Sequence, residues 1–197
     1  MIINAMTLTP ILLAYLLGSI PTGLLLGKMY GIDVRKEGSG NIGATNLYRT
    51  VGRKVGIITL VGDCFKGLIP VLVIKYFALP VEVAAWVGLA AFCGHVFSVF
   101  LGFKGGKGVA TALGVFLGLS PLSVAIVLAL FVLLMIKWRY VSLGSISAAA
   151  VMPLAVYLFG NGPTVIFVTS IISLIVIARH YENIRRLLAG TENRFKT

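Results

Sequence analysis

Long apolar stretches alternate with short basic loops along this chain, and this alternation limits what the chain can fold into. The stretches cover about residues 7–27, 55–77, 83–102, 122–136, 141–159 and 163–178, with a shorter one at 109–119. A helix needs about 20 apolar residues to cross a bilayer. Hydrophobic residues make up 58% of the chain and charged residues only 12%, too few to cover a water-soluble globule. The sequence therefore predicts an all-α integral membrane protein and excludes a cytosolic enzyme or a secreted domain.

The basic residues predict which side of the membrane each loop faces. Lys and Arg number 17 against 6 Asp and Glu, a net charge of +11. Loops rich in Lys and Arg remain cytoplasmic. If residues 109–136 form two helices broken at Ser120 and Pro121, 15 of the 17 cations fall on one side, whereas one long helix would place the basic tail outside. We therefore expect seven transmembrane segments, the fourth short or re-entrant, with the N-terminus outside and the C-terminus cytoplasmic.

Several polar residues interrupt the apolar stretches. Pro21 is expected to kink the first stretch. Asp63 and Lys66 lie three residues apart on one helical face and can pair. His95 is either a functional residue or a side chain that is hydrogen-bonded within the bundle. The two cysteines belong to no metal or disulfide motif. The length fits a single membrane-embedded domain over residues 1–197.

The first cytoplasmic loop contains the segment GSGNIGATNLYRT at residues 38–50. Its GxGxxG pattern does not indicate a dinucleotide fold, because no buried strand precedes it. Glycines still let backbone N–H groups converge on an anion. Side-chain donors of the same segment are Ser39, Asn41, Thr45, Asn46 and Arg49. The segment is therefore a candidate anion site, the alternative being a flexible polar turn.

A second loop, residues 103–108, combines two lysines with three glycines and is here named the glycine–lysine loop. It is not a Walker A motif, because Gly108 stands where Ser or Thr is required. The start of a helix at Val109 would add N–H groups and partial positive charge. Lys104 and Lys107 can instead be ordinary cytoplasmic anchors, which explains Lys104 better than Lys107. The arrangement nonetheless favours a compact anion site.

The C-terminal segment, residues 178–194, carries a third polar cluster. If the last apolar helix continues, His180 and Asn183 share one face. Ser145, in the preceding apolar stretch, is expected near the same surface. The alternative is an interfacial helix that binds anionic lipid. Carboxylates are scarce in all three clusters, which disfavours paired-carboxylate chemistry and divalent-metal hydrolysis. Recognition of phosphate groups by fixed donors, with one histidine, fits better.

Three segments resemble, in order, the signature blocks of the bacterial acyl-phosphate-dependent glycerol-3-phosphate acyltransferases of the PlsY type: GSGNIGATNLYRT, GHVFSVFLGFKGGKGVAT and HYENIRRLLAGTENR. The resemblance implies an enzyme of the bacterial cytoplasmic membrane that needs no metal or other cofactor. Such an enzyme moves an acyl group from acyl phosphate to the 1-hydroxyl of glycerol 3-phosphate. The products are lysophosphatidic acid and phosphate, in phospholipid synthesis.

The resemblance also implies site residues. The family's phosphate-binding and catalytic positions fall on Ser39, Asn41, Thr45, Arg49, Lys104, Lys107, Ser145, His180 and Asn183. We assign catalysis to Ser39, Lys107, His180 and Asn183. We assign phosphate binding to the others together with Gly105, Gly106 and Gly108. The proton of the hydroxyl passes either to His180 or to a phosphate oxygen of the donor, and no Ser–His–Asp set is evident, which favours transfer without an acyl-enzyme.

The expected partners are acyl phosphate, glycerol 3-phosphate and membrane lipid, without nucleic acid, and we expect a monomer whose active site faces the cytoplasm. Two other functions use the same cations. A transporter or channel for phosphorylated anions would show inverted repeats, and we find none in the sequence. A membrane scaffold that binds anionic lipid explains the charge but not the glycine-rich blocks.

Overall fold

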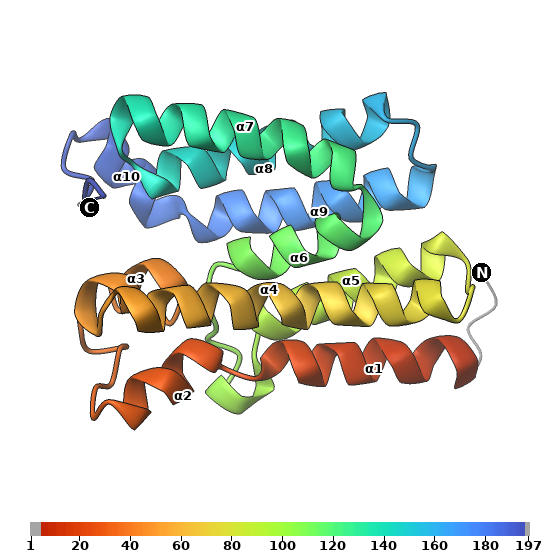
Figure 1. The fold of residues 1–197 in the computed structure, drawn as a ribbon, viewed down its shortest axis with the longest axis horizontal. Coiled ribbons are helices and arrows are strands. Elements are labelled where there is room, and N and C mark those ends of the chain that lie inside the picture. Colours follow the sequence, from red (N-terminus) through yellow and green to blue (C-terminus); the bar gives the residue numbers. More distant parts are fainter. Residues whose placement is uncertain (1–4, 196–197) are drawn as a thin grey trace. The chain divides into compact units, whose positions relative to one another are not determined.

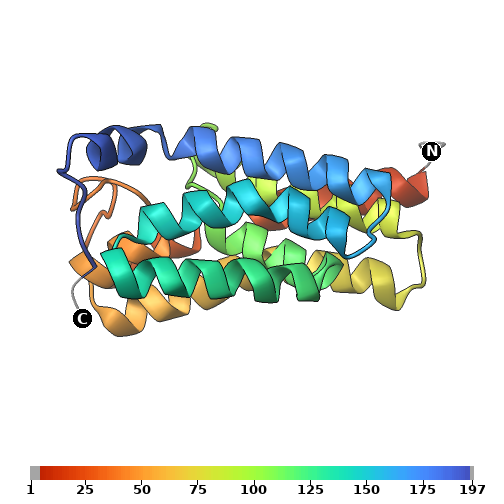
Figure 2. The same ribbon diagram turned by 90° about the horizontal axis from the view of Figure 1, so that it is seen from above.

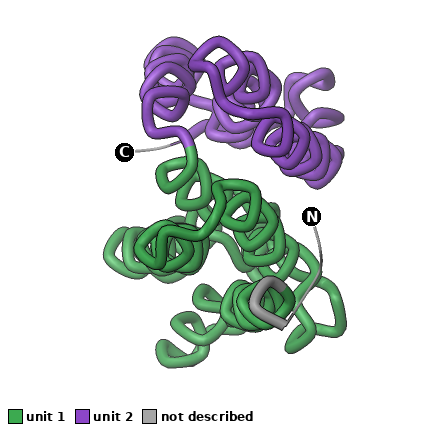
Figure 3. Tube along the Cα trace, turned by 90° about the vertical axis from the view of Figure 1, so that its right-hand side faces the viewer, with its two compact units in different colours: residues 1–119 green, residues 120–197 purple. Residues whose placement is uncertain are grey.

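A computed structural model describes residues 5–195, and within that range the chain is entirely helical apart from turns. The chain divides into two compact units, residues 1–119 and 120–197 (Figure 3). Unit 1 contains α1 (Ala5–Ser19), α2 (Thr22–Met29), α3 (Ala44–Thr50), α4 (Arg53–Tyr76), α5 (Val81–Val96), a 3₁₀ turn (Val99–Leu101) and α6 (Val109–Leu119). Unit 2 contains α7 (Pro121–Trp138), α8 (Val141–Leu158), α9 (Pro163–Arg179) and α10 (Tyr181–Leu188). The all-α prediction is confirmed.

Among the described residues, five segments are long and apolar enough to cross a membrane, and α9 with α10 would make a sixth despite a 56° bend between them. The five are Leu8–Met29, Arg53–Tyr76, Val81–Leu101, Pro121–Trp138 and Val141–Leu158. The predicted break within residues 109–136 is confirmed, because α6 ends at Leu119 and Pro121 starts α7. With 11 residues, α6 is too short to span a bilayer as a helix. The count of seven segments and the orientation of the termini remain predictions, and Lys196 of the basic tail lies outside the described residues.

In unit 1, α4 packs against both α5 and α6, and α1 packs against α5 (Figure 1). Glycines make the closest of these approaches possible. A side chain at Gly67 of α4 would overlap the backbone of Thr111, and one at Gly114 of α6 would overlap the backbone of Cys64. Small residues let the backbones of two membrane helices come into contact. Helices can then pack closely in lipid, where no hydrophobic effect drives them together. This contact fixes the position of α6, and with it the loop that precedes α6.

The predicted kink at Pro21 is a break between α1 and α2. The break leaves carbonyl groups without helical partners, and such groups must find donors inside the protein. Ser98 Oγ donates to the Ser19 carbonyl at 2.6 Å, and Lys66 Nζ donates to the Ile20 carbonyl at 2.9 Å. Lys66 Nζ also lies 3.0 Å from Asp63 Oδ1, which confirms the predicted pair. The pair therefore joins α4 to the break in the first apolar stretch.

The other end of α6 is held by a second lysine. Lys75, in the last turn of α4, donates from Nζ to the Gly118 carbonyl at 3.0 Å. The last carbonyls of a helix lack intrahelical partners and carry partial negative charge, so an ammonium group there is favourable. Lys66 and Lys75 are the two cations that the charge pattern placed outside the cytoplasmic loops. Both serve the packing of unit 1.

In unit 2, α8 packs against both α7 and α9, and the three run side by side (Figure 2). The chain after α10 turns back toward the start of α8. The Phe195 N–H donates to the Arg139 carbonyl at 2.6 Å, and Arg194 Nε donates to the Tyr140 hydroxyl at 3.3 Å. These contacts bring the C-terminal segment beside the loop between α7 and α8.

Candidate active site

The 38–50 segment is an ordered loop built around Asn46. The Asn46 side chain is only 3% exposed. Its Nδ2 donates to the carbonyls of Val34, Glu37 and Asn41 at 3.1, 3.1 and 2.9 Å, and its Oδ1 accepts the Ser39 N–H at 2.9 Å. From its place in the segment, Asn46 is expected to donate to a ligand. In the structure its amide is occupied within the loop, which argues against a flexible turn.

The predicted phosphate ligands of this segment surround α3. Asn41 Oδ1 accepts the Gly43 N–H at 3.0 Å, which leads the chain into the helix. Thr45 lies in the first turn of α3 and is half-buried, whereas Arg49 in the last turn and Ser39 before the helix are exposed. The loop thus presents a hydroxyl and a guanidinium group at its surface. Because Gly38 and Gly40 have φ values of 59° and 68°, the turns before Asn41 favour glycine.

Arg35, a cation near this segment, is paired with a carboxylate. Arg35 Nη2 and Nε donate to the two carboxylate oxygens of Asp33 at 2.7 and 2.9 Å. These hydrogen bonds from Arg35 hold the pKa of the Asp33 carboxyl well below its usual range. Arg35 is therefore matched by a local carboxylate, and it is not among the predicted ligands.

An apolar cluster brings the first segment close to the glycine–lysine loop. Its buried members are Leu24, Val34, Ile42, Leu47 and Val55. Leu101, which precedes the glycine–lysine loop, packs against this cluster. Unit 1 therefore holds the first two signature blocks on one shared core.

The glycine–lysine loop lies on the last turn of α5. The Gly105 N–H donates to the Val96 carbonyl at 3.0 Å, and the Gly106 N–H donates to the His95 carbonyl at 3.1 Å. Gly108, with φ of 83°, leads directly into α6, whose first turn begins at Val109. The two N–H groups are therefore used within unit 1. Among the groups expected to bind phosphate in this loop, Lys107 and the N-terminus of α6 are not used by these two hydrogen bonds.

The lysines of the loop differ in environment. Lys104 is exposed just after the 3₁₀ turn, whereas Lys107 is half-buried beside the start of α6. A side chain at Gly108 would overlap the Phe92 ring. The glycines thus let the backbone approach α5, as the predicted anion site requires.

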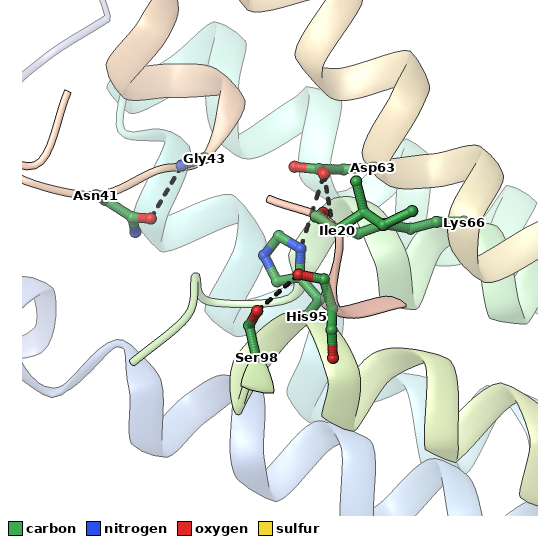
Figure 4. A network of polar contacts seen from close by, with 8 residues as sticks. Ile20, Asn41, Gly43, Asp63, Lys66, His95 and Ser98 are labelled. Atoms are coloured by element: carbon green, nitrogen blue, oxygen red, sulfur yellow. Dashed lines mark hydrogen bonds and ion pairs between the residues drawn. The ribbon is translucent and has the colours of Figure 1, made fainter. Parts of the chain in front are cut away.

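Beneath this loop, His95 lies near the buried pair of Asp63 and Lys66 (Figure 4). His95 Nδ1 is 3.8 Å from Asp63 Oδ1. The sequence alone leaves open whether His95 is functional or is hydrogen-bonded within the bundle. The structure places its ring between a buried carboxylate and the loop.

In unit 2, the Glu192 carboxylate accepts hydrogen bonds from residues of the third signature block and from α8. Its Oε1 accepts hydrogen bonds from Asn183 Nδ2 and Ser142 Oγ, both at 2.7 Å, and its Oε2 accepts one from Arg186 Nε at 2.7 Å. Burial raises the pKa of this carboxyl, but the three hydrogen bonds outweigh burial and leave the pKa below its ordinary value. Glu192 is one of the few carboxylates in the three clusters, and the sequence alone indicates no role for it. The available signal was an acid that follows the turn at Gly190 and lies among hydrogen-bond donors.

His180 occupies the break between α9 and α10 and is buried. The expected continuous helix is instead bent there by 56°. His180 Nδ1 lies 2.7 Å from the Val176 carbonyl oxygen. Because a carbonyl oxygen can only accept, the proton must be on Nδ1, and in neutral His180 the lone pair is on Nε2. The ring is thus set in the tautomer that a proton-accepting Nε2 requires.

Ser145 is less suited to its predicted role. Its hydroxyl donates to the Val141 carbonyl at 2.9 Å within α8. A hydroxyl has one proton to donate, so binding a phosphate through it would require this hydrogen bond to break.

The chain matches the family model described as "Glycerol-3-phosphate acyltransferase" over residues 8–190. It is 68% identical over 183 residues to a glycerol-3-phosphate acyltransferase of Trichlorobacter lovleyi, covering 93% of this chain and 94% of the relative. It is 61% identical over 194 residues to the enzyme of that name from Geobacter sulfurreducens, covering 98% and 99%.

Two solved structures are also similar. Both are crystal structures of PlsY (YgiH), an integral membrane glycerol 3-phosphate acyltransferase, one in the glycerol 3-phosphate form and one in the lysophosphatidic acid form. Their TM-scores are 0.93 and 0.91 at 43% identity, covering 98% of this chain and 97% of theirs. With the family model and the relatives, they show that this chain belongs to the glycerol-3-phosphate acyltransferase family of integral membrane enzymes.

Proposed function

We propose that this enzyme transfers an acyl group from acyl phosphate to the 1-hydroxyl of glycerol 3-phosphate. The hydroxyl oxygen attacks the acyl carbonyl carbon, a C–O ester bond forms, and the bond from that carbon to the phosphate oxygen breaks. The hydroxyl proton passes to a base, and inorganic phosphate leaves with the bonding electron pair. The products are lysophosphatidic acid and phosphate.

The main support for this proposal is the structure of the glycine–lysine loop at the start of α6. It combines a half-buried lysine with a helix N-terminus, two features that favour bound phosphate. Acyl phosphate is an activated mixed anhydride, so the protein needs mainly to position the hydroxyl and to stabilise developing charge. Lys107 supplies that charge stabilisation. Direct transfer then needs no acyl-enzyme and no cofactor.

The remaining residues divide between phosphate binding and handling of the hydroxyl. Phosphate binding is assigned to Asn41, Thr45, Arg49, Lys104 and Gly108, and to Ser145 once its hydrogen bond to the Val141 carbonyl breaks. For the two glycines before Lys107 the role is to shape the backbone, because their N–H groups bond to α5. Ser39 and Asn183 orient the reacting groups. The names of the solved relatives support glycerol 3-phosphate as the acceptor and lysophosphatidic acid as the product.

Two groups can take the proton. His180 Nε2 is one, supported by the hydrogen bond that holds the ring through Nδ1. A phosphate oxygen of the donor is the other, which would make the reaction substrate-assisted. The variant His180→Asn distinguishes these two acceptors.

Residues 1–197 work as one membrane-embedded acyltransferase domain in the bacterial cytoplasmic membrane, as a monomer in contact with lipid. Its seven segments leave the N-terminus outside and the C-terminus inside. The cytoplasmic side receives both phosphate substrates, which suits the distribution of Lys and Arg.

A donor comparison tests the proposed reaction. The purified protein in detergent receives glycerol 3-phosphate with palmitoyl phosphate, palmitoyl-CoA or palmitoyl acyl carrier protein in parallel. We expect lysophosphatidic acid and inorganic phosphate in equal amounts from palmitoyl phosphate and no product from the other two. Product formation from palmitoyl-CoA at a comparable rate would contradict the proposed donor.

A further inference from the structure

We propose that His95 is a positioning residue, held by Asp63, that sets the place of Gly106 and thereby of Lys107. This inference rests on the proposed role of the glycine–lysine loop in binding phosphate. It assigns a task to a buried histidine and a buried ion pair that the reaction scheme above does not use.

On the loop side, His95 contacts the segment through its backbone and its ring. Its carbonyl accepts the Gly106 N–H at 3.1 Å. A Cβ at position 106 would overlap the His95 ring at Nε2, whereas a Cβ at position 105 would overlap the His95 carbonyl oxygen. The ring therefore limits how closely Gly106 can approach α5. Because Lys107 is the next residue, its backbone position follows from that limit.

On the opposite side, the ring is connected to two further elements. Nδ1 lies 3.8 Å from Asp63 Oδ1, and the same oxygen lies 3.0 Å from Lys66 Nζ. Lys66 Nζ also donates to the Ile20 carbonyl at the break after α1. The three side chains are between 3% and 5% exposed. A shift of Asp63 would therefore reach the ring, and through the ring the loop.

The cost of burying charges argues that this arrangement has a purpose. Two buried charges are often replaceable by apolar side chains without loss of stability, so a buried ion pair is weak evidence for stability alone. Here the carboxylate faces one edge of the His95 ring while the other edge faces Gly106. Fixing the ring's orientation is a task that an apolar replacement would not perform.

A pair of double-mutant cycles tests the contact. Gly106→Ala adds a methyl group that meets the His95 ring, whereas Gly105→Ala adds one that meets backbone oxygens of His95 and Val96. We combine each with His95→Ala and measure kcat/KM for glycerol 3-phosphate at saturating palmitoyl phosphate. The Gly106 pair should lose about tenfold less than the product of its single losses, whereas the Gly105 pair should lose the full product.

Equal behaviour of the two cycles would overturn the proposal, because the backbone clash at Gly105 does not depend on the ring. If His95→Ala does not accumulate as folded protein, His95→Gln takes its place in both cycles. Lys107→Ala is measured in the same assay. Unchanged activity of that variant would reject the proposed function itself, whereas loss of activity with no coupling at Gly106 would reject only the role of His95.

A separate measurement tests the part played by Asp63. The double variant Asp63→Asn with Lys66→Met removes both charges and leaves neither one unpaired. We expect KM for one phosphate substrate to rise about tenfold while kcat changes less, because the loop is misplaced rather than absent. Lys75→Met serves as the control for general loosening of unit 1. An unchanged KM in the double variant, or the same rise in the control, would overturn the link from Asp63 to the loop.

Discussion

Asn183 Nδ2 and Ser142 Oγ both donate to a single oxygen of Glu192, at 2.7 Å each. Asn183 lies in α10 and Ser142 in the first turn of α8, so one carboxylate oxygen joins two helices through the returning C-terminal segment. The other oxygen accepts from Arg186. The third signature block is thus a folded structure held by an acid, in which Asn183 is positioned before any substrate arrives.

This arrangement predicts acid-sensitive stability. The folded-state pKa of Glu192 is below its ordinary value of 4.5, so its contribution is complete above that pH and is lost as the pH falls through the lowered pKa. Glu192→Gln should cost about 1–3 kcal/mol near neutral pH, because hydrogen bonds to a charged group are replaced by weaker ones. The loss of Tm on acidification should also be smaller in the variant. Thermal unfolding in detergent, measured from pH 7 down to the lowest pH at which the protein stays folded, gives the stability difference and the decrease in Tm. Parallel curves of Tm against pH for the two proteins would contradict the prediction.

Lys107→Ala should lower kcat/KM for acyl transfer by about a hundredfold or more, as expected on removal of a charge-stabilising donor. Lys137→Ala is the matched control, because Lys137 is exposed and lies over the Trp138 ring in unit 2. The control should retain activity close to that of the original protein. Phosphate release with both substrates measures the two variants, and equal losses would reject a specific role for the glycine–lysine loop.

His180→Asn distinguishes the two proton acceptors. The amide can donate a hydrogen bond as Nδ1 does, but it has no basic nitrogen. If Nε2 takes the proton, kcat should fall by about a hundredfold or more while KM for glycerol 3-phosphate changes little. A rise in KM with kcat largely retained would favour proton transfer to the donor phosphate. Steady-state kinetics with varied glycerol 3-phosphate separates these results.

Lys75→Met should destabilise unit 1 by about 1 kcal/mol, because the Gly118 carbonyl loses its charged donor. Catalytic constants of the folded protein should stay close to their original values, since Lys75 lies at the opposite end of α6 from the glycine–lysine loop. Denaturation in detergent gives the stability, and the phosphate assay gives the activity. A large loss of kcat at unchanged stability would contradict this purely structural role.

Single cysteines at positions 39, 104 and 185 test the proposed orientation, in a background in which Cys64 and Cys93 are replaced by alanine. All three positions are exposed in the structure. In intact cells a membrane-impermeant maleimide should label none of them, and after permeabilisation it should label all three. A cysteine at the exposed Gly162 is the outside control, because Gly162 lies in the turn between α8 and α9 and a Cβ there meets no neighbouring atom. Labelling of the first three positions in intact cells would reverse the topology.

Features that depend on neighbouring residues could be predicted from the sequence. The apolar stretches gave the helices, because the length of a hydrophobic run is a local property. Pro21 and Pro121 marked breaks, and the three-residue spacing of Asp63 and Lys66 indicated their pair. The bend at His180 was missed, because no proline or glycine marks it.

Features that join distant residues could not be predicted in this way. Ser142 and Glu192 are 50 residues apart, and Lys75 and Gly118 are 43 apart. No spacing rule relates such positions before the fold brings them together. For the same reason, the sequence suggested that Asn46 was a donor to ligand, whereas its amide binds carbonyls of its own loop. The signature blocks identified the family, but they did not indicate the role of each residue within them.

Two hydrogen bonds fasten Gly105 and Gly106 to the end of α5, and their consequence concerns engineering as well as catalysis. A backbone already fixed in shape needs no ordering when a reactant arrives, so less of the binding free energy is lost to entropy. Redesign toward a different phosphorylated acceptor should therefore leave Gly105, Gly106 and their hydrogen bonds to α5 unchanged. The residues to vary are those whose side chains surround this loop.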